Sequence, residues 1–207
     1  MKKIALFDID KTLIPYDSFL KWIALVLKKN KSKWLKIPGL VLGGFTAIGK
    51  PEKLTRYKEK WLSLADGLAE EEIAELSEKF VKERIIPDLK PGVEEKIKQY
   101  KDSGYTVIFA TASPEVYFRY LAEYFEVDYF FGTQAQNCDG KWKIVGQNCK
   151  GQEKIRRISE KLSENEINKA ESVGFSDSMS DYPFSRLVKS FHLVDKKYWK
   201  TVKSFIQ

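Results

Sequence analysis

The sequence predicts an α/β fold in which a parallel sheet, covered by helices, carries an inserted all-helical block. Beyond residue 87, short apolar runs typical of buried strands alternate with helical segments, the pattern of a parallel sheet with right-handed crossovers. One more strand-like run, Ile4–Phe7, precedes residues 15–86, which show no strand-like alternation. We therefore expect a core formed by residues 1–14 and 87–207, and a helical subdomain formed by residues 15–86.

The inserted block is expected to contain four helices: Phe19–Lys29, Trp34–Ile48, Pro51–Leu64 and Glu70–Arg84. Asp17 or Ser18 can cap the first of these helices, and Pro51 fits the first turn of the third. The second segment is strongly apolar and is interrupted by glycines.

Helices and strands then alternate. We expect helices at Val93–Lys101, Glu115–Phe125 and Lys150–Leu162. We expect strands at Tyr105–Ala110, Tyr129–Gly132, Ala170–Phe175 and Ser190–Val194, the last followed only by a short basic tail. The dipeptide Asp139-Gly140, between two strand-like runs, is typical of a tight hairpin turn.

Composition excludes several classes of site. Among 207 residues, 36 Lys and Arg against 29 Asp and Glu leave a net charge of +7, which favours anionic partners. A single histidine, His192, rules out a multi-histidine zinc site, and we expect it to be structural. Cys138 and Cys149 are too few for a disulfide scaffold, so we expect reduced thiols. With no secretory signal and no apolar run of the ~18–20 residues that a membrane span needs, we expect a cytoplasmic protein.

Polar side chains cluster where three predicted strands end. They are Asp8 and Asp10, Thr111 and Ser113, and Asp177 and Asp181. Ligands of open α/β sheets gather at the carboxyl ends of the strands, so neighbouring strands would bring these carboxylates together. Converging carboxylates repel one another unless a cation is present, and an all-oxygen site suits Mg²⁺.

The spacing of Asp8 and Asp10 suggests a mechanism. One carboxylate can attack phosphorus and form an aspartyl-phosphate, while the other protonates the leaving oxygen and then activates water. The hydroxyl of Thr12 can hold the loop that joins them.

These motifs resemble the phosphatase branch of the haloacid dehalogenase (HAD) superfamily. The family's motifs are matched in order by Asp8-Ile9-Asp10-Lys11-Thr12, by a strand ending in Thr111, by a lysine at the head of a helix, and by the acidic cluster Asp177–Asp181. The helical insertion resembles a C1 cap, which places the chain nearest the phosphoserine-phosphatase-like subfamily IB. The resemblance implies a Rossmann-like parallel sheet, the HAD fold, with this cap inserted.

The resemblance also implies roles at the catalytic centre. Asp8 would be the nucleophile and Asp10 the general acid and base, with both on the metal, Asp10 through its backbone carbonyl. Asp177 would ligate the metal, and Asp181 would ligate it or orient a metal-bound water. Lys154 is favoured over Lys150 as the active-site lysine, because its distance from Asp177 suits the family.

Four further residues are candidates for binding substrate. Thr111 would bind the phosphoryl group. Ser113 is a second candidate for binding substrate, although capping of the following helix is its simpler interpretation. Asp17 either caps a helix or faces a substrate amine. Arg56 could bind a carboxylate or phosphate, although a solvated helix face is simpler.

Three positions depart from the family pattern. Lys11 and Ser176 stand where glycine is common, and neither change removes a ligand. The segment Thr111-Ala112-Ser113-Pro114 replaces the Ser-Gly-Gly usual in phosphoserine phosphatases, which argues against phosphoserine as the substrate.

Together these features predict a Mg²⁺-dependent phosphomonoester hydrolase that acts on a small phosphorylated metabolite, with no nucleic-acid partner. Two alternatives remain: a lipid-phosphate phosphatase or peripheral membrane-binding protein, and a non-catalytic binding protein on the same fold. The membrane alternative rests on Trp34–Ile48 and the lysines around it, Lys31, Lys33, Lys36 and Lys50. We favour packing of this segment inside the cap.

Overall fold

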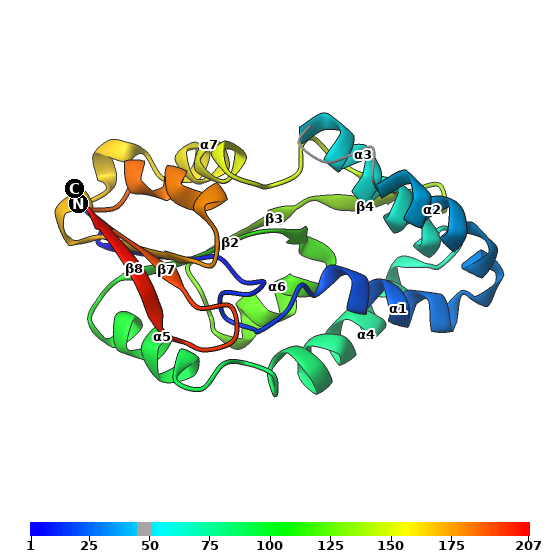
Figure 1. Cartoon of the computed structure of the whole chain (residues 1–207), viewed down its shortest axis with the longest axis horizontal. Coiled ribbons are helices and arrows are strands. Elements are labelled where there is room, and N and C mark those ends of the chain that lie inside the picture. The colour runs from blue at the N-terminus through cyan, green and yellow to red at the C-terminus, as the bar shows by residue number, and fades with distance from the viewer. Residues whose placement is uncertain (45–50) are drawn as a thin grey trace.

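A computed structural model describes residues 1–44 and 51–207, and it confirms the α/β class with a parallel sheet (Figure 1). Six strands form the main sheet in the order β3-β2-β1-β6-β7-β8. Their bounds are β1 Ile4–Phe7, β2 Thr106–Pro114, β3 Tyr129–Thr133, β6 Val173–Ser176, β7 Ser190–Val194 and β8 Thr201–Ile206. All neighbours pair in parallel except β8, which runs antiparallel to β7 at the edge.

The central strand β1 is buried on both faces, which explains why its four residues are all apolar. Ile4 and Leu6 pack with helix α7 (Gln152–Lys161) on one face. Ala5 and Phe7 pack on the other face with α5 (Val93–Asp102) and α6 (Glu115–Tyr124). Figure 1 shows α7 on one side of the sheet and α5 and α6 on the other. The next residue after β1 is Asp8, which this packing places at the carboxyl edge of the sheet.

Between β1 and β2, every regular element that the structure describes is helical. Besides α5, which covers the sheet, the helices are α1 Phe19–Lys29, α2 Ile37–Gly44, α3 Pro51–Leu62 and α4 Glu70–Phe80, which form the helical block. Shorter turns are the 3-10 segments η1 Lys31–Lys36 and η2 Ser63–Ala65, and the π-helical η3 Val81–Ile85. This block lies at the opposite end of the molecule from the two termini (Figure 1).

The predicted hairpin forms, and it packs on the helical block. Strands β4 (Ala135–Cys138) and β5 (Lys141–Ile144) pair antiparallel across a turn in which Asp139 and Gly140 both have positive φ. The backbone N–H of Trp142 donates to the Asp66 carboxylate, and the indole ring is buried. A segment that lies between β3 and β6 in sequence thus contributes to the end of the molecule that holds α1 to α4.

The prediction of a short tail after Ser190–Val194 was wrong, because residues 201–206 form β8. Asp195 organises the intervening turn, since its carboxylate accepts hydrogen bonds from the backbone N–H groups of Lys197 and Tyr198. The remaining connections contain three 3-10 segments, η4 Glu164–Glu166, η5 Lys169–Glu171 and η6 Met179–Arg186.

The expected packing of the Trp34–Ile48 segment inside the cap is wrong for its first part. Ile37 and Leu40 pack against the core, but the exposed fractions are 54% for Trp34, 92% for Leu35 and 51% for Val41. The side chain of Leu42 and residues Phe45 and Ile48 lie outside the described part. Within residues 1–44 and 51–207, no helix combines the length and apolar character needed to cross a membrane.

Candidate active site

A cavity of about 350 Å³ opens where β1, β2 and β6 end, between the sheet edge and helices α1 and α3. The structure brings five carboxylates to it: Asp8, Asp10, Asp17, Asp177 and Asp181. Strands β2 and β6 flank β1 in the sheet, so the residues at the carboxyl ends of the three strands meet at one edge. The convergence expected from the strand ends is therefore present in the fold.

Asp8 lies buried at the base of this cavity. Its Oδ1 accepts a hydrogen bond from Lys154 Nζ (2.7 Å), and its Oδ2 accepts one from Thr12 Oγ1 (2.8 Å). The same Thr12 oxygen accepts from the backbone N–H of Asp177 (2.9 Å), which ties the loop after β1 to the loop after β6. Burial raises the pKa of Asp8 to about 7, although the Lys154 ammonium opposes the rise.

Lys154 is fully buried in the first turn of α7 and lies between two carboxylates. Its Nζ is 2.7 Å from Asp8 Oδ1 and 2.7 Å from Asp181 Oδ2. Burial alone would lower the pKa of this lysine, but the two carboxylates outweigh burial and raise it, so the ammonium stays charged. Lys150 also lines the cavity, but its side chain is exposed, so the geometry favours Lys154 as the lysine beside Asp8.

Asp10 is held by the end of β2 and by the entry to α1. Its Oδ2 accepts from Ser113 Oγ (2.5 Å) and its Oδ1 from the backbone N–H of Ser18 (2.7 Å). Burial, and next the neighbouring Asp17, raise the pKa of Asp10 to about 6. The simpler interpretation of Ser113 as a helix cap was wrong, because Pro114 occupies the N-cap of α6 and the Ser113 hydroxyl donates to Asp10 instead.

The remaining predicted binding residues divide into two groups. Thr111 is buried and lines the cavity at the end of β2, as expected. Asp17, one residue before the N-cap Ser18 of α1, lines the cavity, and its Oδ1 accepts from the backbone N–H of Phe19 (3.1 Å); its contact with a substrate amine stays a prediction. Arg56 is exposed and is not among the cavity residues. It lies two positions from Lys58 on α3, about 200° around the helix, and so faces away.

Lys58 is the main feature that sequence reasoning missed. Its Nζ donates to the Ala112 carbonyl (2.6 Å) and to Asn148 Oδ1 (2.8 Å), joining α3 to the sheet edge. Burial lowers its pKa to about 8. Four residues of α3 with spacing i, i+3, i+4 and i+7 line the cavity: Leu54, Tyr57, Lys58 and Trp61. That spacing on one helix face is the signal that could have identified Lys58.

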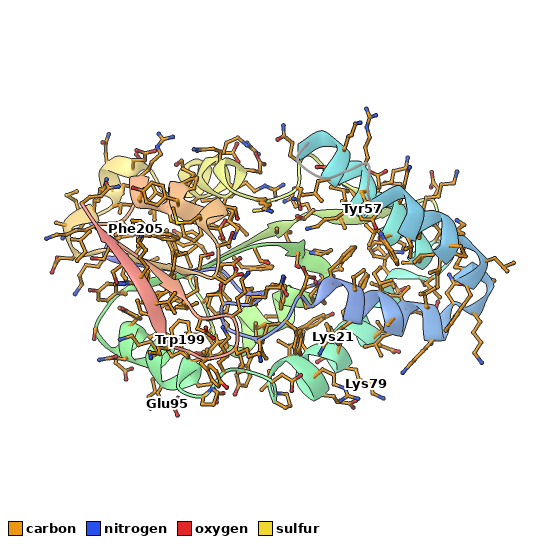
Figure 2. The ribbon with its side chains drawn as sticks, viewed as in Figure 1. Lys21, Tyr57, Lys79, Glu95, Trp199 and Phe205 are labelled. Atoms are coloured by element: carbon orange, nitrogen blue, oxygen red, sulfur yellow. The ribbon has the colours of Figure 1, made fainter. Side chains whose placement is uncertain are left out.

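Aromatic side chains of the helical block form the wall opposite the carboxylates. Phe19 of α1 and Tyr57 and Trp61 of α3 line the cavity, and the rings of Tyr57 and Trp61 meet edge to face at 6.2 Å. Figure 2 shows Tyr57 in the helical block, far from Trp199 and Phe205 near the C-terminal strand. The cavity thus has carboxylates at the sheet edge and aromatic rings on the helical block, where Asp17 and Lys58 add one charge of each sign.

Lys90, also missed, fixes the loop that carries the two aspartates. Its buried Nζ donates to the carbonyls of Lys11 (2.5 Å) and Asp195 (2.7 Å), and burial lowers its pKa to about 8. Lys11 has φ 59°, a left-handed conformation that glycine adopts without strain. This conformation explains physically why glycine is common at this position of the motif.

The donor set fits a hard divalent cation. Within the described residues, no group of three or more His, Cys, Asp or Glu side chains is placed to hold a metal by itself. However, Asp181 Oδ1 is buried with no hydrogen-bond partner there, and burial raises the pKa values of Asp8, Asp10 and Asp177. Mg²⁺ typically takes one or two carboxylates and keeps several waters, so a site completed by water and backbone oxygen suits it.

The chain is similar in sequence to a known hydrolase family and to a phosphatase. The sequence model of the haloacid dehalogenase-like hydrolases matches residues 5–186. A histidinol-phosphatase of Neisseria meningitidis serogroup C (strain 8013) is 27% identical over 205 residues, covering 91% of this chain and 88% of that protein.

Solved structures share the fold at lower identity. A protein with unknown function from Bordetella pertussis Tohama I has a TM-score of 0.72 at 22% identity, covering 89% of this chain and 86% of that one. A phospho-aspartyl intermediate analogue of phosphoserine phosphatase has a TM-score of 0.64 at 21% identity, covering 93% and 86%.

Proposed function

The chain belongs to the haloacid dehalogenase-like hydrolase family, and from that premise we propose that it is a Mg²⁺-dependent phosphomonoester hydrolase. One observation carries the proposal. The Asp8 carboxylate stands at the carboxyl end of the central strand, between a buried ammonium and a threonine hydroxyl, with a second raised-pKa carboxylate, Asp10, lining the same cavity. A nucleophile beside an independent acid and base is what transfer of a phosphoryl group to a side chain and then to water requires.

The first half of the reaction forms an aspartyl-phosphate. A carboxylate oxygen of Asp8 attacks phosphorus, the bond from phosphorus to the ester oxygen breaks, and Asp10 gives its proton to the departing alkoxide. Lys154 offsets the negative charge that gathers between Asp8 and the phosphoryl oxygens. Thr111, which lines the cavity near the carboxyl end of β2, would donate to a phosphoryl oxygen.

The second half releases phosphate. Asp10, now ionised, takes a proton from a water that attacks phosphorus, and the bond from Asp8 to phosphorus breaks. A pKa of about 6 lets Asp10 exist in both protonation states near neutral pH, which both halves need. Ser113 and the Ser18 N–H hold its carboxylate in place through the cycle.

Asp8, Asp177 and the backbone carbonyl of Asp10 would hold the Mg²⁺, and the free Oδ1 of Asp181 would orient one of its waters. Bound there, the cation supplies positive charge beside the phosphoryl oxygens and relieves repulsion among the carboxylates.

We further propose that residues 15–86 act as a cap that selects the substrate. The aromatic wall of Phe19, Tyr57 and Trp61 suits a flat or apolar leaving group, and the exposed carboxylate of Asp17 suits a cationic one. The name of the Neisseria relative makes histidinol phosphate, which offers both features, the first substrate to test. A cavity of about 350 Å³ accommodates a small metabolite.

A phosphatase screen over a panel of phosphomonoesters, with and without Mg²⁺, tests the proposal. We expect Mg²⁺-dependent turnover that Asp8→Asn reduces by at least ~10³-fold, about 4 kcal/mol of barrier, whereas Asp102→Asn, an exposed control on α5, leaves it unchanged. Undiminished turnover by Asp8→Asn would rule out the mechanism. Tight binding of phosphomonoesters without turnover would instead support a binding protein.

The metal assignment has its own measurement. Binding to the native state alone raises the melting temperature, so Mg²⁺ should stabilise the wild type. Asp177→Asn should blunt that response. Equal responses of the two proteins in a thermal-shift titration would remove Asp177 from the proposed ligands.

A further inference from the structure

One surface at the far end of the helical block is not explained by the proposed reaction. It lies where the chain passes from α1 through η1 to α2, at the end of the molecule opposite the termini (Figure 1). We call it the basic tip and define it by Trp34, Leu35, Val41, Lys28, Lys31 and Lys36, all exposed. None of its residues lines the cavity.

The apolar part of the basic tip is displayed to solvent. No residue of η1 is buried, and Leu35 has an exposed fraction of 92%. Trp34 is 54% exposed, although its indole Nε1 donates to the Leu27 carbonyl (3.0 Å), so the structure fixes this ring at the surface. Isolated exposed apolar residues are common, but three large ones within eight positions mark an interaction surface more often.

The charge of the same segment has one sign. Residues 18–44 contain six lysines, at positions 21, 28, 29, 31, 33 and 36, and no Asp or Glu. This excess of six compares with a net charge of +7 for the whole chain. Lys29 pairs with Glu72, but Lys28, Lys31 and Lys36 form no ion pair within the described residues. Their charge is therefore available to an external anionic partner.

We propose that the basic tip docks on an anionic phospholipid surface. Trp34, Leu35 and Val41 would enter the boundary between headgroups and acyl chains, and Lys28, Lys31 and Lys36 would lie among the headgroups. Tryptophan, aliphatic side chains and lysines together are the composition of interfacial segments, because indole and lysine each combine an apolar body with a polar end. The tip also lies at the end of the molecule opposite the termini, where a bilayer can approach it (Figure 1).

This docking is peripheral, and it does not depend on the proposed phosphatase activity. The described helices are too short or too polar to span a bilayer, so attachment would rest on shallow insertion and charge. Because the charge part is screened by salt, binding should weaken as ionic strength rises. The structure therefore predicts reversible attachment that depends on lipid charge.

Vesicle flotation of the full chain tests the proposal. With phosphatidylcholine vesicles that contain phosphatidylglycerol, we expect at least ~10-fold tighter binding than with phosphatidylcholine alone, since each lysine near an anionic surface contributes about fivefold. Binding to the anionic vesicles should fall strongly towards ~1 M salt. Equal binding to both vesicles, or no binding to either, would overturn the proposal.

Matched variants locate the surface. The double variant Trp34→Ala with Leu35→Ser should reduce vesicle binding at least ~10-fold. The control, Tyr198→Ala with Val202→Ser, removes two apolar side chains that are 67% and 59% exposed elsewhere on the molecule, and it should bind like the wild type. Equal binding by wild type and tip variant would overturn the assignment.

Two further readouts separate the alternatives. Unchanged melting temperatures of both variants would show that the fold is intact, whether or not the protein hydrolyses phosphomonoesters. Concentration-dependent dimerisation that the tip variant abolishes, without vesicle binding by the wild type, would show that a second copy of the chain covers the tip and would overturn the lipid proposal.

Discussion

Asp8, Lys154 and Asp181 form a buried group of three charges with one negative charge in excess. An aspartate whose pKa rises from 3.8 to about 7 on folding binds a proton in the native state between those pH values. Its contribution to stability is fully present below 3.8 and is lost as pH rises through about 7. The ionised Asp8 carboxylate, which is the proposed nucleophile, therefore destabilises the metal-free native state at the pH where it could attack.

This coupling predicts an opposite effect of Asp8→Asn on stability and on turnover. In the presence of a chelator at about pH 8, the variant should melt several degrees above the wild type, because asparagine can still accept from Lys154 but carries no charge. The difference should shrink towards about pH 5, and Mg²⁺ should also reduce it by stabilising the wild type. Melting curves with a constant difference at both pH values would contradict the raised pKa.

Lys154 and Lys150 can be separated by a matched pair of substitutions. Lys154→Met leaves two buried carboxylates facing each other without their cation, so we expect a loss of about 3 kcal/mol or more in the free energy of unfolding, and a fall in kcat of at least ~100-fold. Lys150→Met changes an exposed side chain and should alter stability by less than about 0.5 kcal/mol. Denaturant unfolding and steady-state kinetics of both variants measure the contrast, and similar losses in the two would refute the assignment.

The sequence predicted those site residues whose position follows from a strand end. Asp8 and Asp177 come directly after buried strands and Thr111 lies near the carboxyl end of β2, so parallel pairing of β1 with β2 and β6 is enough to bring them together. Lys58 and Lys90 were missed because their partners are backbone carbonyls 54 and 79 residues away in sequence. The presence of a lysine, among 36 Lys and Arg residues, does not reveal such a partner, and only the helical spacing around Lys58 marks its face of α3.

At the scale of single elements, the loop after β1 contains a residue in a strained backbone conformation. Lys11 has φ 59° and its carbonyl accepts from Lys90, so the loop is held in a conformation that is unfavourable for a residue with a Cβ. We expect Lys11→Gly to raise the free energy of unfolding by up to about 1 kcal/mol, because glycine adopts this φ without strain.

Lys11→Ala is the matched control for that prediction. It also removes the lysine side chain from the cavity but keeps the Cβ, so it should not stabilise the protein. If both variants gained the same stability in denaturant unfolding, the gain would come from the lost side chain and not from the backbone.

Strand β8 shows where local sequence is insufficient. Residues 201–206 contain three polar positions, Thr201, Lys203 and Ser204, and five of the six residues are exposed. The strand is stabilised by its pairing with β7, including the contact of Phe205 with Phe191 and the bond between Ser204 Oγ and His192 Nδ1. These are contacts between elements, which periodicity along one segment does not contain. They also agree with the structural role expected for His192.

At the scale of the whole molecule, Asn148 is one of the residues that join the helical block to the sheet edge. Its Oδ1 accepts from Lys58 Nζ and from Thr133 Oγ1, and its backbone N–H donates to Thr55 Oγ1. Two residues of α3 are thus fastened to the segment that leads into α7, whose first turn carries Lys154. The position of α3 over the cavity and the position of Lys154 are therefore linked through a few polar contacts.

This arrangement predicts that Lys58→Met loosens the block from the sheet. The variant leaves the Ala112 carbonyl and Asn148 Oδ1 without a donor from α3, so we expect faster hydrogen exchange in residues 145–151 and in α3, and a fall in kcat/KM of about tenfold, ~1.4 kcal/mol. The pKa of Lys58 is lowered to about 8, but a neutral amine keeps two N–H groups, which is the number the two contacts use. Exchange in these segments should therefore not increase through deprotonation of Lys58 as pH rises through 8.

The control for Lys58→Met lies on the same helix. Arg56→Met removes an exposed cation that faces away from the cavity, and it should leave exchange in residues 145–151 and kcat/KM within about twofold of the wild type. Because the exchange measurement is made without substrate, it separates loosening of the block from loss of a direct substrate contact. A fall in kcat/KM for Lys58→Met with wild-type exchange would mean that Lys58 acts on the substrate, and that the block stays in place without it.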